Sequence, residues 1–217
     1  MILLLTLLLL SYLAGSMPTS IIAGKLLKGI DIRDHGSGNA GGTNAFRVLG
    51  AGPALAVVAV DIFKGWLAAA IISALTFGGA LGGLPFNNPV LVAILCGSAA
   101  VLGHTYTVFA GFKGGKGVGT LAGMVFYLAP LVIPLGFLAW ALVLMASGYV
   151  GLSSITAVSL FPVVIFVRDG TLNSTVGYFS VIIALFIWFT HRSNIQRMLA
   201  GTENRFEKAR IFHRAKK

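Results

Sequence analysis

Residues 118–147 read VGTLAGMVFYLAPLVIPLGFLAWALVLMAS, an apolar stretch with Pro130 and Pro134 in its middle. The stretch is long for one transmembrane helix, which needs about 20 residues. Because proline breaks or kinks the interior of a helix, the stretch either crosses a bilayer once or turns at the prolines and crosses twice. The number of membrane crossings in the whole chain depends on this choice.

Further apolar stretches fall at about 1–23, 51–77, 89–102, 152–167 and 172–190. The chain is 57% hydrophobic and 10% charged, whereas soluble domains carry about 25% charged residues. We therefore expect an integral membrane protein with no separate soluble domain, that is, a single transmembrane domain over residues 1–217. No positive charge precedes the first apolar stretch, so we expect a retained helix rather than a cleaved signal peptide.

Three polar segments interrupt the apolar chain. The first reads GSGNAGGTNAFR (36–47), the second GHTYTVFAGFKGGKGVGT (103–120) and the third HRSNIQRMLAGTEN (191–204). Each is rich in Gly, Asn, Ser or Thr together with Arg or Lys, which is the composition of backbone nests and cationic clamps for phosphate. The pattern predicts chemistry on a phosphorylated substrate at the membrane surface.

The distribution of positive charge chooses between the two topologies. The formal net charge is +10, and many of its cations follow His191: Arg192, Arg197, Arg205, Lys208, Arg210, Arg214, Lys216 and Lys217. Cytoplasmic segments carry an excess of Lys and Arg, and all three polar segments share the cytoplasmic face only if residues 118–147 turn at the prolines. We therefore predict an all-α, polytopic protein with seven transmembrane helices, some of them short, an outside N-terminus and a cytoplasmic C-terminus.

The second polar segment carries the sharpest phosphate signal. Gly114, Gly115, Lys116 and Gly117 directly precede an apolar helix, and glycine amides with a lysine at a helix N-terminus form an anion site. A nucleotide-hydrolysing phosphate loop would need glycine at Ala110 and Ser or Thr at position 117. Phosphate binding is thus expected and nucleotide hydrolysis is disfavoured.

The other two segments supply hydrogen-bonding and cationic groups. In the first, Ser37, Asn39, Thr43 and Asn44 can hydrogen-bond, and Arg47 offers a forked cation, although a Gly/Asn-rich turn is an alternative explanation. In the third, a continued helix would place His191, Asn194 and Met198 on one face with Arg197 beside it. An Arg/His cluster at a helix C-terminus also suits the helix dipole and lipid without any further role.

Two charged residues lie inside the second apolar stretch. Asp61 and Lys64 are three residues apart and share a helix face. Charges within a membrane are usually paired or line a polar cavity. The pair is either an internal structural contact or a source of positive potential beneath the phosphate site.

Metal and cofactor chemistry has little support. The four His are scattered and no Cys/His/carboxylate cluster has ligand spacing. The lone Cys96 lies in an apolar run, where we expect it to pack. No nucleic-acid recognition motif accompanies the basic charge, so nucleic acid is not an expected partner.

Taken together, the three segments resemble one family, the bacterial acyl-phosphate:glycerol-3-phosphate acyltransferases (the PlsY family). The resemblance lies in Ser37-Gly38-Asn39 through Thr43-Asn44 and Arg47, then Gly103-His104 through Phe109 and Gly114–Val118, then His191-Arg192, Asn194-Ile195, Arg197, Gly201 and Glu203. It extends over most of the chain. Thr107 stands where the family usually has proline, Gly119 where alanine is usual, and Ala40 where a larger apolar residue is common. These departures concern the shape of the loops more than their chemistry.

The resemblance implies an acyltransferase that moves a fatty acyl group from acyl phosphate to the 1-hydroxyl of glycerol 3-phosphate. The products would be lysophosphatidate and phosphate, in the first acylation step of phospholipid biosynthesis at the cell inner membrane. Catalytic roles fall on Lys116, His191 and Asn194, and Glu203 is expected to hold the third segment through an Arg contact. Phosphate-binding roles fall on Ser37, Asn39, Thr43, Asn44, Arg47, His104, Gly114, Gly115, Gly117 and Arg197.

The implied partners are acyl phosphate, glycerol 3-phosphate, membrane lipid and a soluble enzyme that produces acyl phosphate; no metal or cofactor is implied. The motif His-x-x-x-x-Asp of other lysophosphatidate-forming acyltransferases is absent, because Ala40, Phe109 and Gln196 stand five residues after His35, His104 and His191. The alternative function is a transporter or channel for an organic phosphate, because Gly-broken basic helices also bind anions within membranes. A non-catalytic lipid-binding scaffold explains the Gly-Gly-Lys-Gly run poorly.

Overall fold

The structure is a computed structural model that describes residues 1–210, and all regular secondary structure in that part of the chain is helical. The described residues form two compact units, Met1–Ala129 (unit 1) and a second that begins at Pro130 (unit 2). Arg214, Lys216 and Lys217, which contributed to the predicted cytoplasmic C-terminus, lie outside the described residues.

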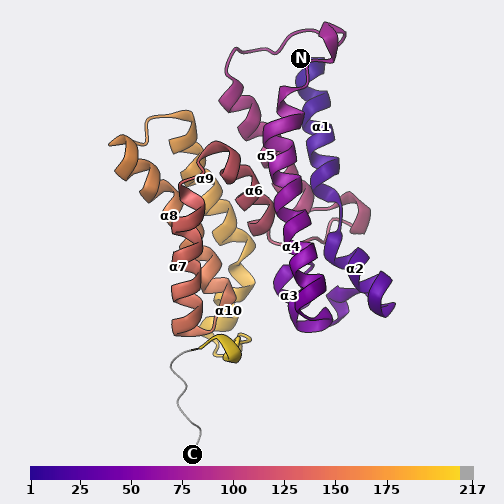
Figure 1. Ribbon diagram of the computed structural model, residues 1–217, viewed down its shortest axis with the longest axis vertical. Coiled ribbons are helices and arrows are strands. Elements are labelled where there is room, and N and C mark those ends of the chain that lie inside the picture. Colours follow the sequence, from indigo (N-terminus) through magenta and orange to yellow (C-terminus); the bar gives the residue numbers. More distant parts are fainter. Residues whose placement is uncertain (211–217) are drawn as a thin grey trace, which may run out of the picture. The chain divides into compact units, whose positions relative to one another are not determined.

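Unit 1 contains the first two polar segments. Its α-helices are α1 (Ile2–Ser16), α2 (Thr19–Lys28), α3 (Gly42–Leu49), α4 (Ala51–Trp66), α5 (Pro89–Thr105) and α6 (Val118–Leu128). Short helical turns add η1 (Ile32–Asp34), η2 (Leu67–Ile71), η3 (Ile72–Ala74), η4 (Phe77–Gly79) and η5 (Val108–Ala110). Helix α1 packs along α5, and α4 packs along α6 (Figure 1).

Glycine brings the paired helices of unit 1 close together. A methyl group on Gly65 of α4 would lie 1.8 Å from the carbonyl oxygen of Thr120, and one on Gly123 of α6 would lie 1.8 Å from that of Ile62. Small residues allow such close backbone approach, from which membrane helices gain their packing contacts. The same contact recurs between α1 and α5, where Gly15 lies against Ala100.

The apolar core of unit 1 supports the first polar segment. One buried cluster lies between α1, α5 and η2–η3 and includes Cys96, which packs there as expected. A second cluster contains Ile32, Ala40 and Ala45, which lie in or beside the first polar segment, together with Val57 of α4. The segment is therefore anchored on apolar side chains rather than suspended in solvent.

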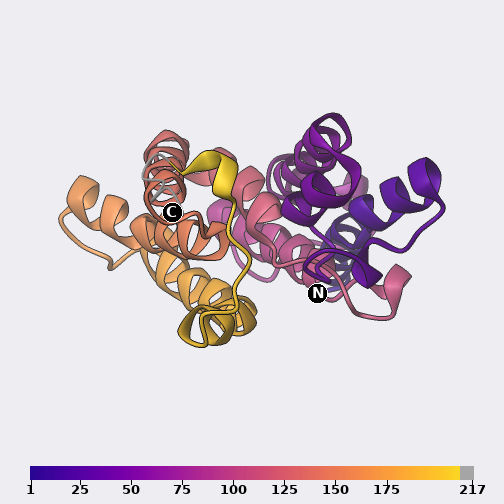
Figure 2. The same ribbon diagram turned by 90° about the horizontal axis from the view of Figure 1, so that it is seen from below.

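Unit 2 contains the third polar segment. Its helices are α7 (Val132–Ser147), α8 (Val150–Asp169), α9 (Thr175–Thr190), α10 (Arg192–Leu199) and the short turn η6 (Glu207–Ala209). Helix α8 packs against both α7 and α9. Helices α7 and α8 each end at a left-handed glycine, Gly148 (φ 77°) and Gly170 (φ 69°), a conformation that glycine adopts without steric cost. Past α10 the chain runs on without regular structure to η6 (yellow in Figure 2).

The predicted break in the stretch 118–147 is present. Helix α6 ends at Leu128 and α7 begins at Val132, so the break surrounds Pro130. Pro134 does not break the chain, because it occupies the third position of α7, where a backbone amide has no intrahelical acceptor anyway. The bend between α9 and α10 is 55°, so the third segment continues as a helix but in a new direction.

The lengths and apolar composition of the helices are those of a membrane protein. Four helical runs among the described residues are long and apolar enough to cross a bilayer, and a fifth is added if the bent pair α9–α10 counts as one span. Helices α6 and α7 are apolar but shorter, at 11 and 16 residues. The all-helical architecture is thus as predicted, whereas the number seven and the orientation of the termini stay predictions.

Candidate functional site

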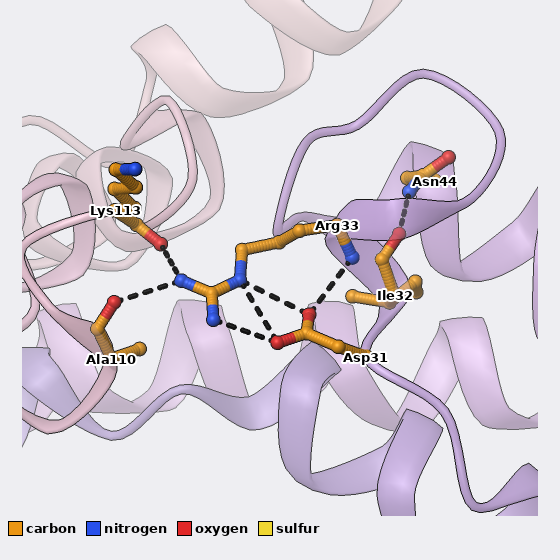
Figure 3. Close-up of polar contacts among 6 residues, drawn as sticks. All are labelled: Asp31, Ile32, Arg33, Asn44, Ala110 and Lys113. Carbon is orange, nitrogen blue, oxygen red and sulfur yellow. Dashed lines mark hydrogen bonds and ion pairs between the residues drawn. The ribbon is translucent and has the colours of Figure 1, made fainter.

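An arginine just before the first polar segment holds the second (Figure 3). Arg33 Nη1 donates to the carbonyl oxygens of Ala110 at 2.8 Å and of Lys113 at 3.2 Å. The other side of its guanidinium binds Asp31, with Nη2 2.7 Å from Oδ2 and Nε 3.0 Å from Oδ1. The two polar segments of unit 1 are therefore joined by a charged side chain. Arg33 was not among the residues predicted from the sequence, although an Arg two residues from an Asp beside a phosphate-type segment is a signal for such a role.

The ion pair of Asp31 and Arg33 is charged at neutral pH. The hydrogen bond from Arg33 lowers the pKa of the Asp31 carboxyl from 3.8 to about 2, against an opposing contribution from burial. The same hydrogen bond raises the pKa of the Arg33 guanidinium. The hydrogen bonds from Arg33 to residues 110–113 are consequently made by a group that stays charged.

Asn44 shapes the first segment from inside. Its side chain is fully buried: Oδ1 accepts from the Ser37 amide at 2.8 Å, and Nδ2 donates to the carbonyl oxygens of Ile32 at 2.9 Å and His35 at 3.0 Å. Both amide hydrogens thus bind backbone oxygens just before the segment. The sequence suggested a phosphate-binding role for Asn44, and the structure instead gives it the task of tying residues 32–37 to α3.

The remaining polar groups of the first segment lie before α3 and along it. Ser37, Asn39, Thr43 and Arg47 are each half-buried. Thr43 and Arg47 lie one turn apart on α3, which places them on the same face. The first amides of a helix have no intrahelical acceptor and carry the positive end of its dipole. The N-terminal end of α3 therefore offers amide and hydroxyl donors suited to an anion, and Arg47 adds a guanidinium one turn further along the same face.

The second segment uses its glycines differently from the sequence-based expectation. The amide of Gly114 donates to Thr105 O and that of Gly115 to His104 O, each at 3.0 Å. These two amides close the C-terminal end of α5, so they are not donors for a phosphate. Both positions require glycine because the chain passes close to the end of α5. A methyl on Gly114 would lie 2.0 Å from His104 O, and one on Gly115 would lie 2.2 Å from His104 Nε2.

In the second segment, the groups that remain suited to an anion are Lys116 and the first amides of α6. Lys116 is half-buried, and Gly117 caps α6 in a left-handed conformation with φ 86°. The helix begins at Val118, so its unsatisfied first amides follow the lysine directly. Of the predicted loop, Lys116 and Gly117 keep positions compatible with phosphate, while Gly114 and Gly115 provide the close packing beneath them.

Helix α1 also contacts the second segment. The Thr107 hydroxyl, at a position where the sequence departs from the family pattern, donates to Ser16 O. The Tyr12 hydroxyl donates to Tyr106 O at 2.6 Å. Threonine thus supplies a hydrogen bond that fixes the shape of the loop. His104, at the end of α5, is buried beside the ion pair of Asp61 and Lys64, whose Oδ1–Nζ distance of 2.8 Å confirms the contact predicted from their spacing.

The third segment holds its histidine at the bend between α9 and α10. His191 is buried, and its Nδ1 lies 2.9 Å from Ile187 O. A carbonyl oxygen only accepts, so Nδ1 carries the hydrogen and Nε2 is the basic nitrogen of the neutral ring. Sequence periodicity expected His191 and Asn194 on one face of a continuous helix; both are buried, but on either side of a bend.

Glu203 binds the third segment together. Its Oε1 accepts from Asn194 Nδ2 at 2.8 Å, and its Oε2 accepts from Arg197 Nε at 2.7 Å. The chain returns to α10 because Gly201 turns with φ 70° and the Glu203 amide donates to Arg197 O at 3.1 Å. The predicted contact of Glu203 with an arginine is confirmed. Each carboxylate oxygen receives a donor, and the structural role of Glu203 stays a prediction.

Comparison with known proteins covers nearly the whole chain. The family model described as glycerol-3-phosphate acyltransferase matches residues 5–201, a range that contains the first two polar segments and most of the third. The chain belongs to the glycerol-3-phosphate acyltransferase family. The resemblance drawn from the polar segments is thereby confirmed.

Individual relatives agree with the family match. The glycerol-3-phosphate acyltransferase of Chlorobium phaeobacteroides (strain BS1) is 48% identical over 218 residues, which is 90% of this chain and 93% of the relative. That of Chlorobaculum tepidum is 46% identical over 215 residues, with the same coverage of 90% and 93%.

Two crystal structures of PlsY, an integral membrane glycerol 3-phosphate acyltransferase, are similar to this chain. The glycerol 3-phosphate form has a TM-score of 0.78 and 37% identity, covering 94% of this chain and 95% of that one. The lysophosphatidic acid form has a TM-score of 0.77 and 36% identity, covering 95% and 97%. The integral membrane character expected from composition agrees with these neighbours.

Proposed function

We propose that this protein is an acyltransferase that acylates the 1-hydroxyl of glycerol 3-phosphate to give lysophosphatidic acid. One observation carries the proposal: the likeness runs almost end to end, through all three polar segments, to enzymes solved in a glycerol 3-phosphate form and in a lysophosphatidic acid form. Those two molecules are the substrate and the product of a single acylation. The reaction is the first acylation step of phospholipid biosynthesis.

The acyl donor in this proposal is acyl phosphate, delivered by a soluble enzyme that produces it. The glycerol hydroxyl oxygen forms a bond to the acyl carbon, the bond from that carbon to the phosphate oxygen breaks, and the hydroxyl proton passes to the departing phosphate. A basic leaving group removes the need for a strong protein base. The absence of a His-x-x-x-x-Asp motif and the wealth of groups suited to two phosphates support this donor.

The proposed roles follow from the chemistry of each side chain. Lys116 stabilises negative charge that develops on a phosphate, an interaction that is strong in a site from which water is excluded. His191 assists proton transfer through Nε2, and Asn194 orients a substrate. Phosphates are bound by Arg47 and Arg197, whose forked donors match phosphate oxygens. The other proposed binding residues are Ser37, Asn39, Thr43 and Gly117, and His104 supports phosphate binding from beneath Gly115.

The proposed topology has seven transmembrane helices in one domain over residues 1–217. The N-terminus lies outside, the C-terminus lies in the cytoplasm, and the site faces the cytoplasm from the inner membrane. The distribution of Lys and Arg supports this arrangement. It places the site where a soluble enzyme can deliver acyl phosphate.

Single cysteines test the topology in sealed cells. Cys96 is buried and is first replaced by alanine. New cysteines are then introduced at Ser37, Lys113 and Ser193; the exposed Lys113 is preferred to Gly115, where a side chain would collide with His104. All three should resist a membrane-impermeant thiol reagent until the cells are opened. Labelling of any of them from outside would overturn the shared cytoplasmic face.

Purified protein tests the activity. Palmitoyl phosphate and glycerol 3-phosphate are supplied together, and lysophosphatidic acid is measured; palmitoyl-CoA replaces the donor in a parallel reaction. Lys116→Ala should lose at least about 100-fold in kcat, because a single oxyanion-stabilising donor is worth that much, while Lys25→Ala at an exposed site of α2 keeps the parent rate. Folded parent protein that forms no lysophosphatidic acid, but carries glycerol 3-phosphate into liposomes, would establish transport instead.

A further inference from the structure

A cluster of buried polar groups lies beneath the second polar segment. Asp61 and Lys64 of α4 are each 4% exposed, and His104 at the end of α5 is 7% exposed. A single carboxylate atom, Asp61 Oδ1, receives three partners: Lys64 Nζ at 2.8 Å, Thr19 Oγ1 at 3.2 Å and His104 Nδ1 at 3.5 Å. Lys64 Nζ also donates to Met17 O at 3.1 Å, in the break between α1 and α2.

The histidine of this cluster supports the turn that precedes α6. The backbone oxygen of His104 accepts from the Gly115 amide at 3.0 Å, and its ring Nε2 faces the Cα of Gly115, where a methyl would come within 2.2 Å. The start of α6 also lies close to the cluster, because a methyl on Gly119 would be 3.1 Å from Asp61 Cβ. Lys116 is thus bracketed by two glycines that rest on the cluster.

A contribution to stability does not by itself explain why the ion pair of Asp61 and Lys64 is buried here. Two charges taken out of water lose hydration that their attraction does not reliably return, and apolar residues of similar shape often stabilise a buried site equally well or better. Charges inside membrane helices usually serve a function. The geometry offers one here, because Asp61 Oδ1 lies 3.5 Å from His104 Nδ1 and can accept its hydrogen, while the opposite edge of the ring, with Nε2, faces Gly115.

We propose that Asp61 is a positioning residue that acts through His104 to place the Gly114–Gly117 turn, and with it Lys116, for acyl transfer. Lys64 neutralises the carboxylate and fastens it to the break between α1 and α2. The inference rests on the proposed function, since it assigns Lys116 to a phosphate of the reaction. What it adds is that an acceptor atom inside the membrane, rather than the charge of the pair, sets the position of the lysine.

Two double variants separate the acceptor from the charge. Asp61→Asn with Lys64→Met and Asp61→Leu with Lys64→Met are both uncharged at these positions and similar in shape, but only asparagine keeps an oxygen for His104 Nδ1. We expect the asparagine variant to keep kcat within about fivefold of the parent, because its side-chain oxygen can still accept from His104 Nδ1 and Thr19 Oγ1. The leucine variant should lose at least about 30-fold in kcat with a similar Tm and a similar KM for glycerol 3-phosphate.

Equal kcat values in the two folded variants would overturn the proposal, whether both are high or both are low. A second pair leaves the membrane charges untouched: His104→Gln can still donate to Asp61, whereas His104→Met cannot. The glutamine variant should be the faster of the two by at least about tenfold, and equal rates would again contradict the positioning role. This pair decides the matter if the leucine variant does not fold. A parent protein that makes no lysophosphatidic acid from acyl phosphate would overturn the proposed function itself, and the inference with it.

Discussion

Replacing Glu203 by glutamine distinguishes a structural carboxylate from a catalytic base. Both oxygens of Glu203 receive donors, Asn194 Nδ2 at 2.8 Å and Arg197 Nε at 2.7 Å. Glutamine offers one oxygen, so it can accept from Arg197 only if its amide faces Asn194. Asn194 can then rotate its side-chain amide so that Oδ1 accepts from the glutamine. Two charge-assisted hydrogen bonds are thereby replaced by weaker ones, and Asn194 presents an oxygen where it had presented its NH2 group.

The size of the effect follows from burial. The Glu203 side chain is 4% exposed, whereas that of Arg197 is 36% exposed. A hydrogen bond to a charged group is worth about 1.5–3 kcal/mol, and removing one member of a fully buried pair costs about 3–5 kcal/mol. Because solvent reaches the arginine, we expect less than the cost of breaking a fully buried pair, about 2 kcal/mol. For a chain of this length that lowers Tm by about 4–8 °C.

The assay combines thermal unfolding of the purified protein with steady-state kinetics well below Tm. Glu203→Gln should show the lower Tm, a raised KM for glycerol 3-phosphate and a kcat within about tenfold of the parent, since an essential base would contribute about 100-fold or more. The matched control is Glu207→Gln, whose partner Arg210 lies 3.1 Å away and whose own side chain is 50% exposed. That variant should change stability by less than about 1 kcal/mol. Native Tm and native KM with no detectable acyl transfer in Glu203→Gln would refute this reasoning and make the carboxylate the general base.

Three further predictions concern unit 1. Asn44→Ala removes three hydrogen bonds of a fully buried side chain and should cost about 2–4 kcal/mol, seen as a lower Tm; an unchanged Tm would show that the bonds contribute little. The folded pKa of Asp31, about 2, lies below its ordinary 3.8, so its contribution to stability is present above about pH 4 and is lost as the pH falls towards 2. Asp31→Asn should therefore flatten the plot of Tm against pH in that window, and parallel plots for parent and variant would contradict the assignment. Gly65→Ala should prevent normal folding, because its methyl would lie 1.8 Å from a backbone oxygen. The control is Gly52→Ala in the same helix, whose methyl would have no neighbour within 4 Å and which should be neutral or stabilise by up to about 1 kcal/mol. Equal yields and Tm values for the two variants would argue against close α4–α6 packing.

Features that depend on neighbours in sequence were predictable. Pro130 ends a helix because its ring clashes with the preceding turn, and α6 stops at Leu128. Asp61 and Lys64 pair because a spacing of three puts them on one helix face, and their side chains meet at 2.8 Å. The contact of Glu203 with an arginine followed from its position as the only acid in a basic segment. Pro134 was misjudged as part of the break, because its effect depends on where within the helix it falls.

The sequence by itself determined the membrane class, the helical architecture, the family and the presence of three phosphate-type segments, since these rest on composition, periodicity and local motifs. The tertiary structure alone decided what individual polar groups do. Arg33 binds carbonyl oxygens 77 and 80 residues away. Asn44 donates both amide hydrogens to the backbone of Ile32 and His35. The amides of Gly114 and Gly115 close α5 instead of facing an anion. A hydrogen bond depends on which donor and acceptor come within about 3 Å of each other, and that is settled by packing between distant parts of the chain rather than by residue type.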